Sequence, residues 1–209
     1  MSFSAFFWDL DGTLLDSYGV IVSSLCMAYR KFGVALDPDV VLWECIAGSM
    51  KQYLEKTEQE TGVSYDSARD THVGIEESRL HLIGLMPHAR ETLEALRERG
   101  ARHFVITHRG SSSHVILKNN GILDLFEDII TAEDGFPRKP DPASLQFLME
   151  KHGLDPAAAV YVGDRIMDVA FANRAGIQSI LYVPEKSVAQ PDGTETYLVR
   201  DLAEILTLA

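Results

Sequence analysis

Cysteine, basic residues and long apolar runs are all scarce in this sequence of 209 residues. The two cysteines, Cys26 and Cys45, do not have the spacing of a disulfide framework, so reduced thiols and a cytoplasmic location are expected. Only 19 Lys and Arg stand against 31 Asp and Glu, a formal net charge of -12, so no nucleic-acid partner is expected. No basic segment precedes the apolar residues 3–8, and Asp9 ends them, so neither a signal peptide nor a membrane partner is expected.

The composition is that of an ordinary globular protein. Hydrophobic residues make up 46% of the chain and charged residues 24%. The length allows one sizeable core with a small additional module. There is no internal repeat and no low-complexity segment.

Strand and helix patterns alternate over most of the chain. Residues 3–8 form a continuous apolar run that ends in Asp and Gly residues, which predicts a short buried strand. After Pro87 the pattern predicts helices at 88–99, 112–120, 142–152 and 166–175, alternating with strands at 103–107, 128–131, 159–162 and 178–182. Repeated units of this kind predict an α/β fold with a doubly wound parallel sheet covered by helices.

One long segment between the first strand and the rest shows helical patterns alone. Ser17 is expected to cap its first helix, and Asp37, with Pro following, is expected to cap the second. We therefore predict an α/β core domain formed by residues 1–16 and 84–209, interrupted by an all-helical domain at residues 17–83.

Polar residues follow several of the predicted strands. Asp9 and Asp11 come after the first strand, Thr107 ends the second, Lys139 lies in the loop after the third, and Asp164 ends the fourth. In an open α/β sheet, ligands bind outside the carboxyl ends of the strands. The four segments are therefore expected to contribute to one site.

The pair Asp9 and Asp11 can supply two functions at such a site. One carboxylate could attack phosphorus while the other protonates the leaving oxygen and later activates water. Gly12 permits a tight turn that exposes backbone N–H groups, and Thr13 adds a hydroxyl, both of which suit a phosphate oxygen. The alternative for an isolated pair is a strand-to-helix turn with two solvated carboxylates.

Further carboxylates are available at the end of the fourth strand. Asp164 and Asp168 are four residues apart, which places them on one face of the opening turn of a helix. Carboxylate oxygens suit Mg²⁺, which would neutralise an anionic phosphate. The alternative is helix capping by Asp164, with Asp168 in the first turn, which needs no metal.

Lys139 and Thr107 could stabilise the phosphate itself. Lys139 precedes Pro140 and could hold the nucleophile and the charged phosphoryl oxygens together. The hydroxyl of Thr107 could donate to a phosphate oxygen. For each the alternative is a solvated or structural residue, the more common fate of lysine in particular.

Taken together, these residues resemble the four motifs of the haloacid dehalogenase superfamily, in the order of that family. The motifs are Asp9-Leu10-Asp11-Gly12-Thr13, then Thr107, then Lys139 before Pro140, then Gly163-Asp164 with Asp168. The resemblance points to the phosphatase branch, and to its phosphoglycolate-phosphatase-like members. It covers residues 3 to about 183, and the segment at 17–83 resembles the helical cap of subfamily I.

The resemblance implies a role for each motif residue. Asp9 would form an aspartyl-phosphate, Asp11 would be the acid and base, Thr107 would bind phosphate, and Lys139 would orient nucleophile and phosphate. Asp11 also argues against dehalogenating and phosphonate-cleaving members, whose second motif position is not Asp. The implied cofactor is Mg²⁺, held by the Asp9 carboxylate, the Asp11 backbone carbonyl and Asp164, with Asp168 beside the site.

The chain departs from many relatives directly after Thr107. His108 could hydrogen-bond substrate or titrate near neutrality, and Arg109 could bind a substrate anion with two hydrogen bonds or simply pair on the surface. In the helical segment, Lys51 could contact a substrate carboxylate or second phosphate, or could be an ordinary surface lysine.

The leading hypothesis is therefore an enzyme, a Mg²⁺-dependent phosphatase acting on a small phosphorylated metabolite, such as phosphoglycolate or a sugar phosphate. A sugar-phosphate mutase of the β-phosphoglucomutase type is the first alternative, since it shares every core residue. A catalytically silent metabolite-binding or regulatory protein is the second. The chain could be a monomer or a homodimer.

Overall fold

The computed structural model describes residues 3–185 and 187–208. The chain divides into two compact units. The first is formed by Met1–Asp16 together with Gly84–Ala209, and the second by Ser17–Ile83.

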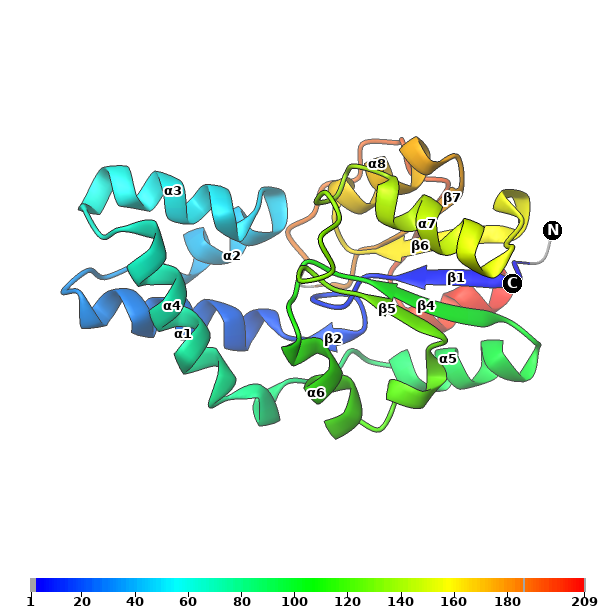
Figure 1. Ribbon diagram of the computed structural model, residues 1–209, viewed down its shortest axis with the longest axis horizontal. Coiled ribbons are helices and arrows are strands. Elements are labelled where there is room, and N and C mark those ends of the chain that lie inside the picture. Colours follow the sequence, from blue (N-terminus) through cyan, green and yellow to red (C-terminus); the bar gives the residue numbers. More distant parts are fainter. Residues whose placement is uncertain (1–2, 186, 209) are drawn as a thin grey trace. The chain divides into compact units, whose positions relative to one another are not determined.

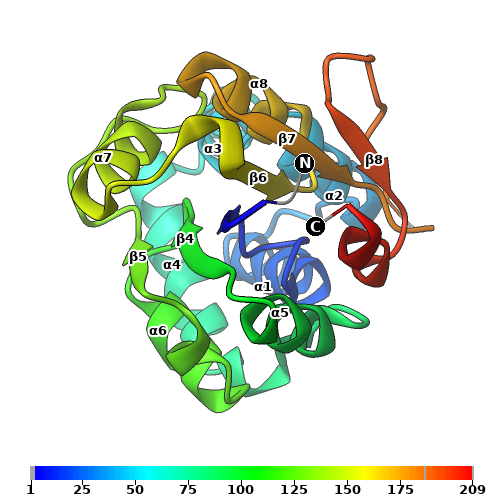
Figure 2. The same ribbon diagram turned by 90° about the vertical axis from the view of Figure 1, so that its right-hand side faces the viewer.

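A parallel sheet forms the centre of the first unit (Figures 1 and 2). In the described residues its strands follow the order β5, β4, β1, β6, β7, β8. Every pairing between neighbouring strands is parallel. The predicted α/β fold with a doubly wound parallel sheet is confirmed. The strand bounds are β1 (Ala5–Trp8), β4 (Arg102–Ile106), β5 (Asp128–Ile130), β6 (Ala159–Gly163), β7 (Gln178–Tyr182) and β8 (Tyr197–Val199).

Helices cover both faces of this sheet, with α7 and α8 on one face and α5 and α6 on the other (Figure 2). A strand covered on both faces needs apolar residues at successive positions instead of alternate ones. All residues of β1 are buried accordingly. The helix bounds are α5 (Ala89–Glu98), α6 (Ser112–Asn119), α7 (Ala143–His152) and α8 (Ile166–Ala175), with 3₁₀ helices η2 (Leu123–Leu125), η3 (Pro156–Ala158) and η4 (Leu202–Thr207).

Side chains of β1 fix the carboxyl end of this strand by packing on both faces of the sheet. Phe7 stacks near Phe104 of β4, with ring centroids 5.1 Å apart, in a buried cluster that includes Leu145 of α7 and Phe171 of α8. Trp8, the next residue, points to the opposite face because successive strand residues alternate. The chain that leaves β1 therefore starts from a rigid position.

A short antiparallel pair of strands joins the two segments of the first unit that flank the second unit. β2 (Leu15–Asp16) pairs with β3 (Gly84–Leu85), so that Leu15 lies opposite Leu85. The Met86 N–H extends the pairing by donating to the Leu14 carbonyl at 2.9 Å. This pair was not predicted, because strands of two residues carry no readable periodicity.

The second unit is helical throughout its described residues, apart from its turns. Its core gathers Leu25, Tyr29, Val41 and Leu54, all of them buried. In the described part of the chain, no helix combines the length and the apolar composition needed to cross a bilayer. The helix bounds are α1 (Tyr18–Lys31), α2 (Pro38–Ala47), α3 (Met50–Thr61) and α4 (Tyr65–Glu77), followed by η1 (Leu80–Leu82).

Most of these helices begin at a side-chain cap. Asp37, Ser49 and Ser64 each accept a hydrogen bond from a backbone N–H in the first turn of the helix that follows. The predicted cap at Ser17 is wrong, although α1 does begin after it. Ser17 has the helical torsions φ -105° and ψ -22°, in place of the extended backbone that directs a capping hydroxyl at the first turn.

His103 connects the sheet to α5 through a buried ring. Its Nδ1 accepts the indole N–H of Trp8 at 3.1 Å, and its Nε2 lies 3.1 Å from the carbonyl oxygen of Leu93. A ring that accepts at one nitrogen and donates at the other is neutral. Burial lowers the pKa of His103 to about 4, which keeps it neutral over the physiological range.

We expect acid to destabilise the first unit through this ring. The unfolded chain gains the proton near pH 6.5, whereas the folded chain gains it only near pH 4, so the free energy of unfolding is highest above that window and falls as pH is lowered through it. The loss attributable to His103 is about 3 kcal/mol at the acid end. Urea unfolding at a series of pH values measures it, with Trp8 emission as the signal in a Trp43→Phe background.

His103→Gln retains a donor and an acceptor but does not titrate. Its free energy of unfolding should depend less on pH in the same window, while His114→Gln, at an exposed position on α6, should leave the dependence as it was. An unchanged pH dependence in His103→Gln would contradict the assignment.

Candidate active site

The candidate residues do come together at the carboxyl ends of three adjacent strands. Asp9 follows β1, Thr107 follows β4, and Asp164 follows β6. Since β1 lies between β4 and β6 in the sheet, Asp9 is central. Lys139 joins from the loop before α7, and its side chain is buried.

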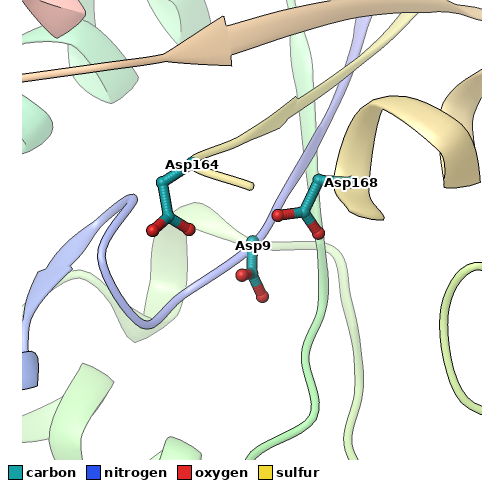
Figure 3. Close-up of side chains that lie close together, drawn as sticks. All are labelled: Asp9, Asp164 and Asp168. Atoms are coloured by element: carbon teal, nitrogen blue, oxygen red, sulfur yellow. The ribbon is translucent and has the colours of Figure 1, made fainter. Parts of the chain in front are cut away.

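A cluster of buried carboxylates is the main feature of this edge (Figure 3). Asp9, Asp164 and Asp168 each place a carboxylate oxygen within 4.8 Å of the others, and all are buried. Three negative charges this close repel one another strongly at low dielectric. The cluster therefore needs cations, either from the protein or from a bound metal ion.

Lys139 supplies one of those cations. Its Nζ lies 3.0 Å from Asp9 Oδ1 and 2.6 Å from Asp168 Oδ1, and the side chains of all three are 1% exposed. Burial nevertheless raises the pKa of the Asp9 carboxyl, and the attraction of Lys139 offsets this only in part. Asp9 is thus a carboxylate removed from water whose shortest ion pair is the one with Lys139, an arrangement suited to a nucleophile.

Asp168 is occupied on both oxygens. Its Oδ1 accepts from Lys139, and its Oδ2 accepts the backbone N–H of Arg165 at 3.2 Å, which caps the start of α8. Gly163 is required beside it, because a Cβ at that position would lie 2.4 Å from the Cβ of Asp168. Asp168 therefore combines helix capping with fixing Lys139.

The turn after Asp9 is closed by its own backbone. Gly12 has the left-handed torsion φ 81°, which a glycine adopts without strain. Its N–H donates to the Leu15 carbonyl at 2.9 Å, and the N–H of Thr13 donates to Leu10 at 3.1 Å. The predicted tight turn is present, and the N–H groups of Gly12 and Thr13 are bonded within it.

The hydroxyl of Thr13 is also committed within the site. It donates to Asp164 Oδ1 at 3.3 Å, in a fully buried position. Thr13 thus orients the Asp164 carboxylate in this structure.

Asp11 is paired with Arg109. The Nη2 of Arg109 lies 2.7 Å from Asp11 Oδ1, and its Nε lies 3.0 and 3.1 Å from the two oxygens. The backbone N–H of Arg109 donates to Thr107 Oγ1 at 3.1 Å, which leaves the hydroxyl proton of Thr107 available to a phosphate oxygen. Arg109 is buried, so the alternative of a surface pair is wrong.

His108 has a structural role in this arrangement. Its Nε2 accepts the backbone N–H of Lys139 at 2.9 Å, which ties the Lys139 loop to the end of β4. Burial, and then the nearby charge of Lys139, lower the pKa of His108 to about 2. The expectation that His108 titrates near neutrality is wrong, because the ring is held away from water among cations.

Lys51 lies in the second unit, on α3. Its side chain is 57% exposed, and its Nζ lies 3.6 Å from Glu55 Oε1, one helical turn away. The structure gives Lys51 the environment of an ordinary surface lysine.

Two residues at the site were missed in the sequence. Arg165 places Nη2 3.5 Å from Asp9 Oδ2 and Nε 3.7 Å from Asp168 Oδ2. Tyr161, on β6, places its hydroxyl 2.9 Å from the Nζ of Lys139 and donates to the Ile106 carbonyl at 2.9 Å. The signal for Tyr161 was a phenol in an otherwise apolar buried strand, since a buried hydroxyl requires a partner.

The donor set fits a divalent cation that prefers oxygen. Asp9 Oδ2 is buried and accepts no hydrogen bond from the described residues. Asp9, Asp164 and Asp168 carry three negative charges, against two positive charges on Lys139 and Arg165. The cluster thus has an excess of negative charge and a carboxylate oxygen available to a metal ion such as Mg²⁺.

Comparison with known proteins agrees with this geometry. A family model described as haloacid dehalogenase-like hydrolase matches residues 6–182. The phosphoglycolate phosphatase of Vibrio vulnificus YJ016 is 30% identical, over 82% of this chain and 80% of its own length. The pyrophosphatase PpaX of Oceanobacillus iheyensis is 24% identical over 100% of this chain and 97% of its own.

The fold agrees as well. A crystal structure described as a predicted phosphoglycolate phosphatase from Haemophilus somnus 129PT superposes with a TM-score of 0.88 at 24% identity. The match covers 100% of this chain and 98% of that one.

The contact between Tyr161 and Lys139 can be tested by removing one oxygen. Tyr161→Phe retains the ring that packs on Phe171 but loses the hydrogen bond that directs Nζ. A hydrogen bond to a charged group stabilises by roughly 1.5–3 kcal/mol, so we expect kcat to fall by about 10–100-fold. KM should change little, because Tyr161 acts through Lys139 and not on substrate.

The measurement is phosphate release from an aryl phosphate, with kcat and KM determined separately. Tyr197→Phe, which makes the same chemical change on β8, is the matched control and should behave as wild type. A Tyr161→Phe enzyme with normal kcat would show that Lys139 does not depend on the phenol.

Proposed function

The chain belongs to the haloacid dehalogenase-like hydrolase family, and on that premise we propose that it is a Mg²⁺-dependent phosphatase acting on a small phosphorylated metabolite. The observation that carries the proposal is the buried carboxylate of Asp9, 3.0 Å from Lys139 and within reach of Asp164. A carboxylate so placed needs both an electrophile and a counter-charge, and a phosphate ester with its metal ion supplies both.

In the first step, an oxygen of Asp9 attacks phosphorus and the bond to the leaving oxygen breaks. The product is an aspartyl-phosphate, and the leaving alkoxide takes a proton from Asp11. In the second step, Asp11 removes a proton from water, which attacks the phosphorus and releases inorganic phosphate from Asp9. Asp11 returns to its protonated form, so the proton balance closes over one turnover.

Lys139 and Thr107 stabilise the charge on the phosphoryl group. The ammonium of Lys139 already lies against Asp9, so it neutralises the oxygens that approach that carboxylate. The hydroxyl of Thr107 accepts from a backbone N–H and can donate its proton to another phosphoryl oxygen. Both residues are buried, which strengthens each interaction relative to water.

Mg²⁺ would be held by carboxylate oxygens of Asp9 and Asp164, with the backbone carbonyl of Asp11 as a further ligand. When bound, it would polarise the phosphoryl oxygens and screen the negative charge of the nucleophile. Thr13 supports this role by orienting Asp164, and Asp168 supports it by holding Lys139. A phosphorylated carboxylic acid or a diphosphate is the substrate class that the relatives' names favour.

Removing the nucleophile should abolish turnover. Asp9→Asn cannot form the acyl phosphate, so we expect release of phosphate from an aryl phosphate to fall by at least about 1,000-fold. Asp11→Asn should likewise lose turnover, because it can neither donate nor accept the proton. The matched control is Asp16→Asn, an exposed carboxylate on β2, which should retain activity. Equal phosphate release from Asp9→Asn and wild type would refute the proposal.

Metal dependence should respond to Asp164. We expect chelation to remove activity and Mg²⁺ to restore it. Removing a hydrogen-bond partner of a metal ligand commonly weakens metal binding by about 10–100-fold, so loss of the ligand itself in Asp164→Asn should raise the half-saturating Mg²⁺ concentration by at least as much. Calorimetric titration with Mg²⁺ measures this without turnover. Asp124→Asn, at an exposed position, is the control, and an unchanged Mg²⁺ affinity in Asp164→Asn would remove that residue from the ligand set.

A further inference from the structure

The ion pair between Arg109 and Asp11 conflicts with the function proposed for Asp11. Both oxygens of the carboxylate face the guanidinium, at 2.7 to 3.1 Å, in a two-point contact. An acid must present a proton to the leaving oxygen, and a base must accept one from water. A carboxylate held in an arginine fork strongly favours its charged form, so carrying a proton to the leaving oxygen requires the pair to open during turnover.

Opening the pair is costly unless another anion replaces the carboxylate. The side chain of Arg109 is 5% exposed and that of Asp11 is 22% exposed, so the guanidinium depends on the protein for charge compensation. Arginine does not lose its proton at any physiological pH. Loss of a carboxylate partner from a buried cation is strongly destabilising.

The position of Arg109 indicates which part of a substrate could supply that anion. Lys139 lies beside the nucleophile Asp9, on the phosphoryl side of the site. Arg109 contacts Asp11, the residue that must reach the leaving oxygen, so it lies on the leaving-group side. The substrate atoms on that side belong to the organic part of the ester and not to the transferred phosphoryl group.

On the basis of the proposed function, we propose that Arg109 exchanges Asp11 for a second anionic group of the substrate. The substrate class is then a phosphate ester that carries a carboxylate or a second phosphate on its leaving group. Binding of that group releases Asp11 for proton transfer, so the same contact selects the substrate and activates the acid and base.

The arginine fork favours a planar carboxylate as the replacement. In the structure Nε and Nη2 already bind a carboxylate, that of Asp11, and a substrate carboxylate can make the same two hydrogen bonds. The backbone of Arg109 is fixed at both ends, because its N–H donates to Thr107 and its carbonyl accepts from Ala132 at 3.0 Å. The side chain therefore exchanges partners from a fixed base.

The test compares substrates that differ only in the second charge. Phosphoglycolate and its neutral amide are such a pair, and inorganic pyrophosphate represents the second phosphate. We expect wild type to prefer the acid over the amide by at least about tenfold in kcat/KM, the value of a charged hydrogen bond. Preference for pyrophosphate over both would identify the second phosphate as the natural group.

Arg109→Gln should lose this preference, because a neutral amide side chain cannot replace the fork. Its kcat/KM values for the acid and for the amide should then lie within about threefold of each other. Arg109→Lys keeps the positive charge but lacks the fork, so it should retain only part of the preference for the acid. Arg97→Gln, on the exposed side of α5, is the matched control and should prefer the acid as wild type does. If Arg109→Gln lowers activity equally on acid and amide, Arg109 only positions Asp11 and the inference is overturned.

A binding measurement tests the exchange without turnover. Asp9→Asn and Asp11→Asn each remove one negative charge, but only Asp11→Asn takes the carboxylate away from Arg109. The ratio of the amide Kd to the acid Kd should therefore be at least about tenfold larger in Asp11→Asn than in Asp9→Asn. Equal ratios would show that Arg109 does not change partners.

Failure of this inference is distinguishable from failure of the proposed function. Wild type that hydrolyses an aryl phosphate, the acid and the amide with similar kcat/KM is a phosphatase without the proposed selectivity. Wild type that releases no phosphate from any of them in the presence of Mg²⁺ would overturn both.

Discussion

The interaction on which the site depends is the buried ion pair of Lys139 with Asp9 and Asp168. The Nζ of Lys139 lies 3.0 Å from Asp9 Oδ1 and 2.6 Å from Asp168 Oδ1, in a region that water does not reach. Burial of this kind is favourable only when geometry and hydrogen bonding are both satisfied, and removal of one partner leaves an uncompensated charge. The start of α8, the phenol of Tyr161 and the loop before α7 all meet at this ammonium. Their positions are therefore coupled, and the loop is further fixed by the bond from Lys139 N–H to His108.

The cations of the site have separate places and so can have separate functions. Lys139 and Arg165 lie against Asp9, whereas Arg109 lies against Asp11. This separation explains how a chain with a net charge of -12 can accept an anionic substrate. The field that matters to a phosphate is set by a few buried charges at short range, and the exposed acidic side chains are screened within about 10 Å.

Much of this could be predicted from the sequence, because the relevant patterns are local. The helix at 166–175 and the strand at 178–182 have the predicted bounds, since Gly176 ends the helix and the strand closes on three apolar residues, Ile180 to Tyr182. The family expected from short motifs at strand ends is confirmed by a family model that matches residues 6–182. β8 was not predicted, because three residues, of which one is exposed, show neither an apolar run nor an alternation.

What could not be predicted was the pairing of residues far apart in the chain. Arg109 and Asp11 are 98 positions apart, and nothing near either residue specifies the other. His108 had the composition of a titrating residue, but its environment is set by Lys139, which lies 31 positions away. Ser17 shows the same limitation at shorter range, because a good capping residue does not cap when its backbone is helical.

The pairing of Asp11 with Arg109 imposes opposite requirements on one carboxylate. As an ion-pair partner it must stay charged and in contact with a buried guanidinium, and in its proposed role as an acid it must carry a proton to the leaving oxygen. A rigid site cannot meet both requirements at once, whereas a site in which the substrate replaces Asp11 meets them in sequence. Water, which carries no net charge, cannot take the place of the carboxylate on Arg109 at comparable strength. The same ion pair that keeps a buried arginine neutralised in the free protein would thus limit proton transfer to the time when an anionic substrate is bound, which couples the chemistry to recognition of the leaving group.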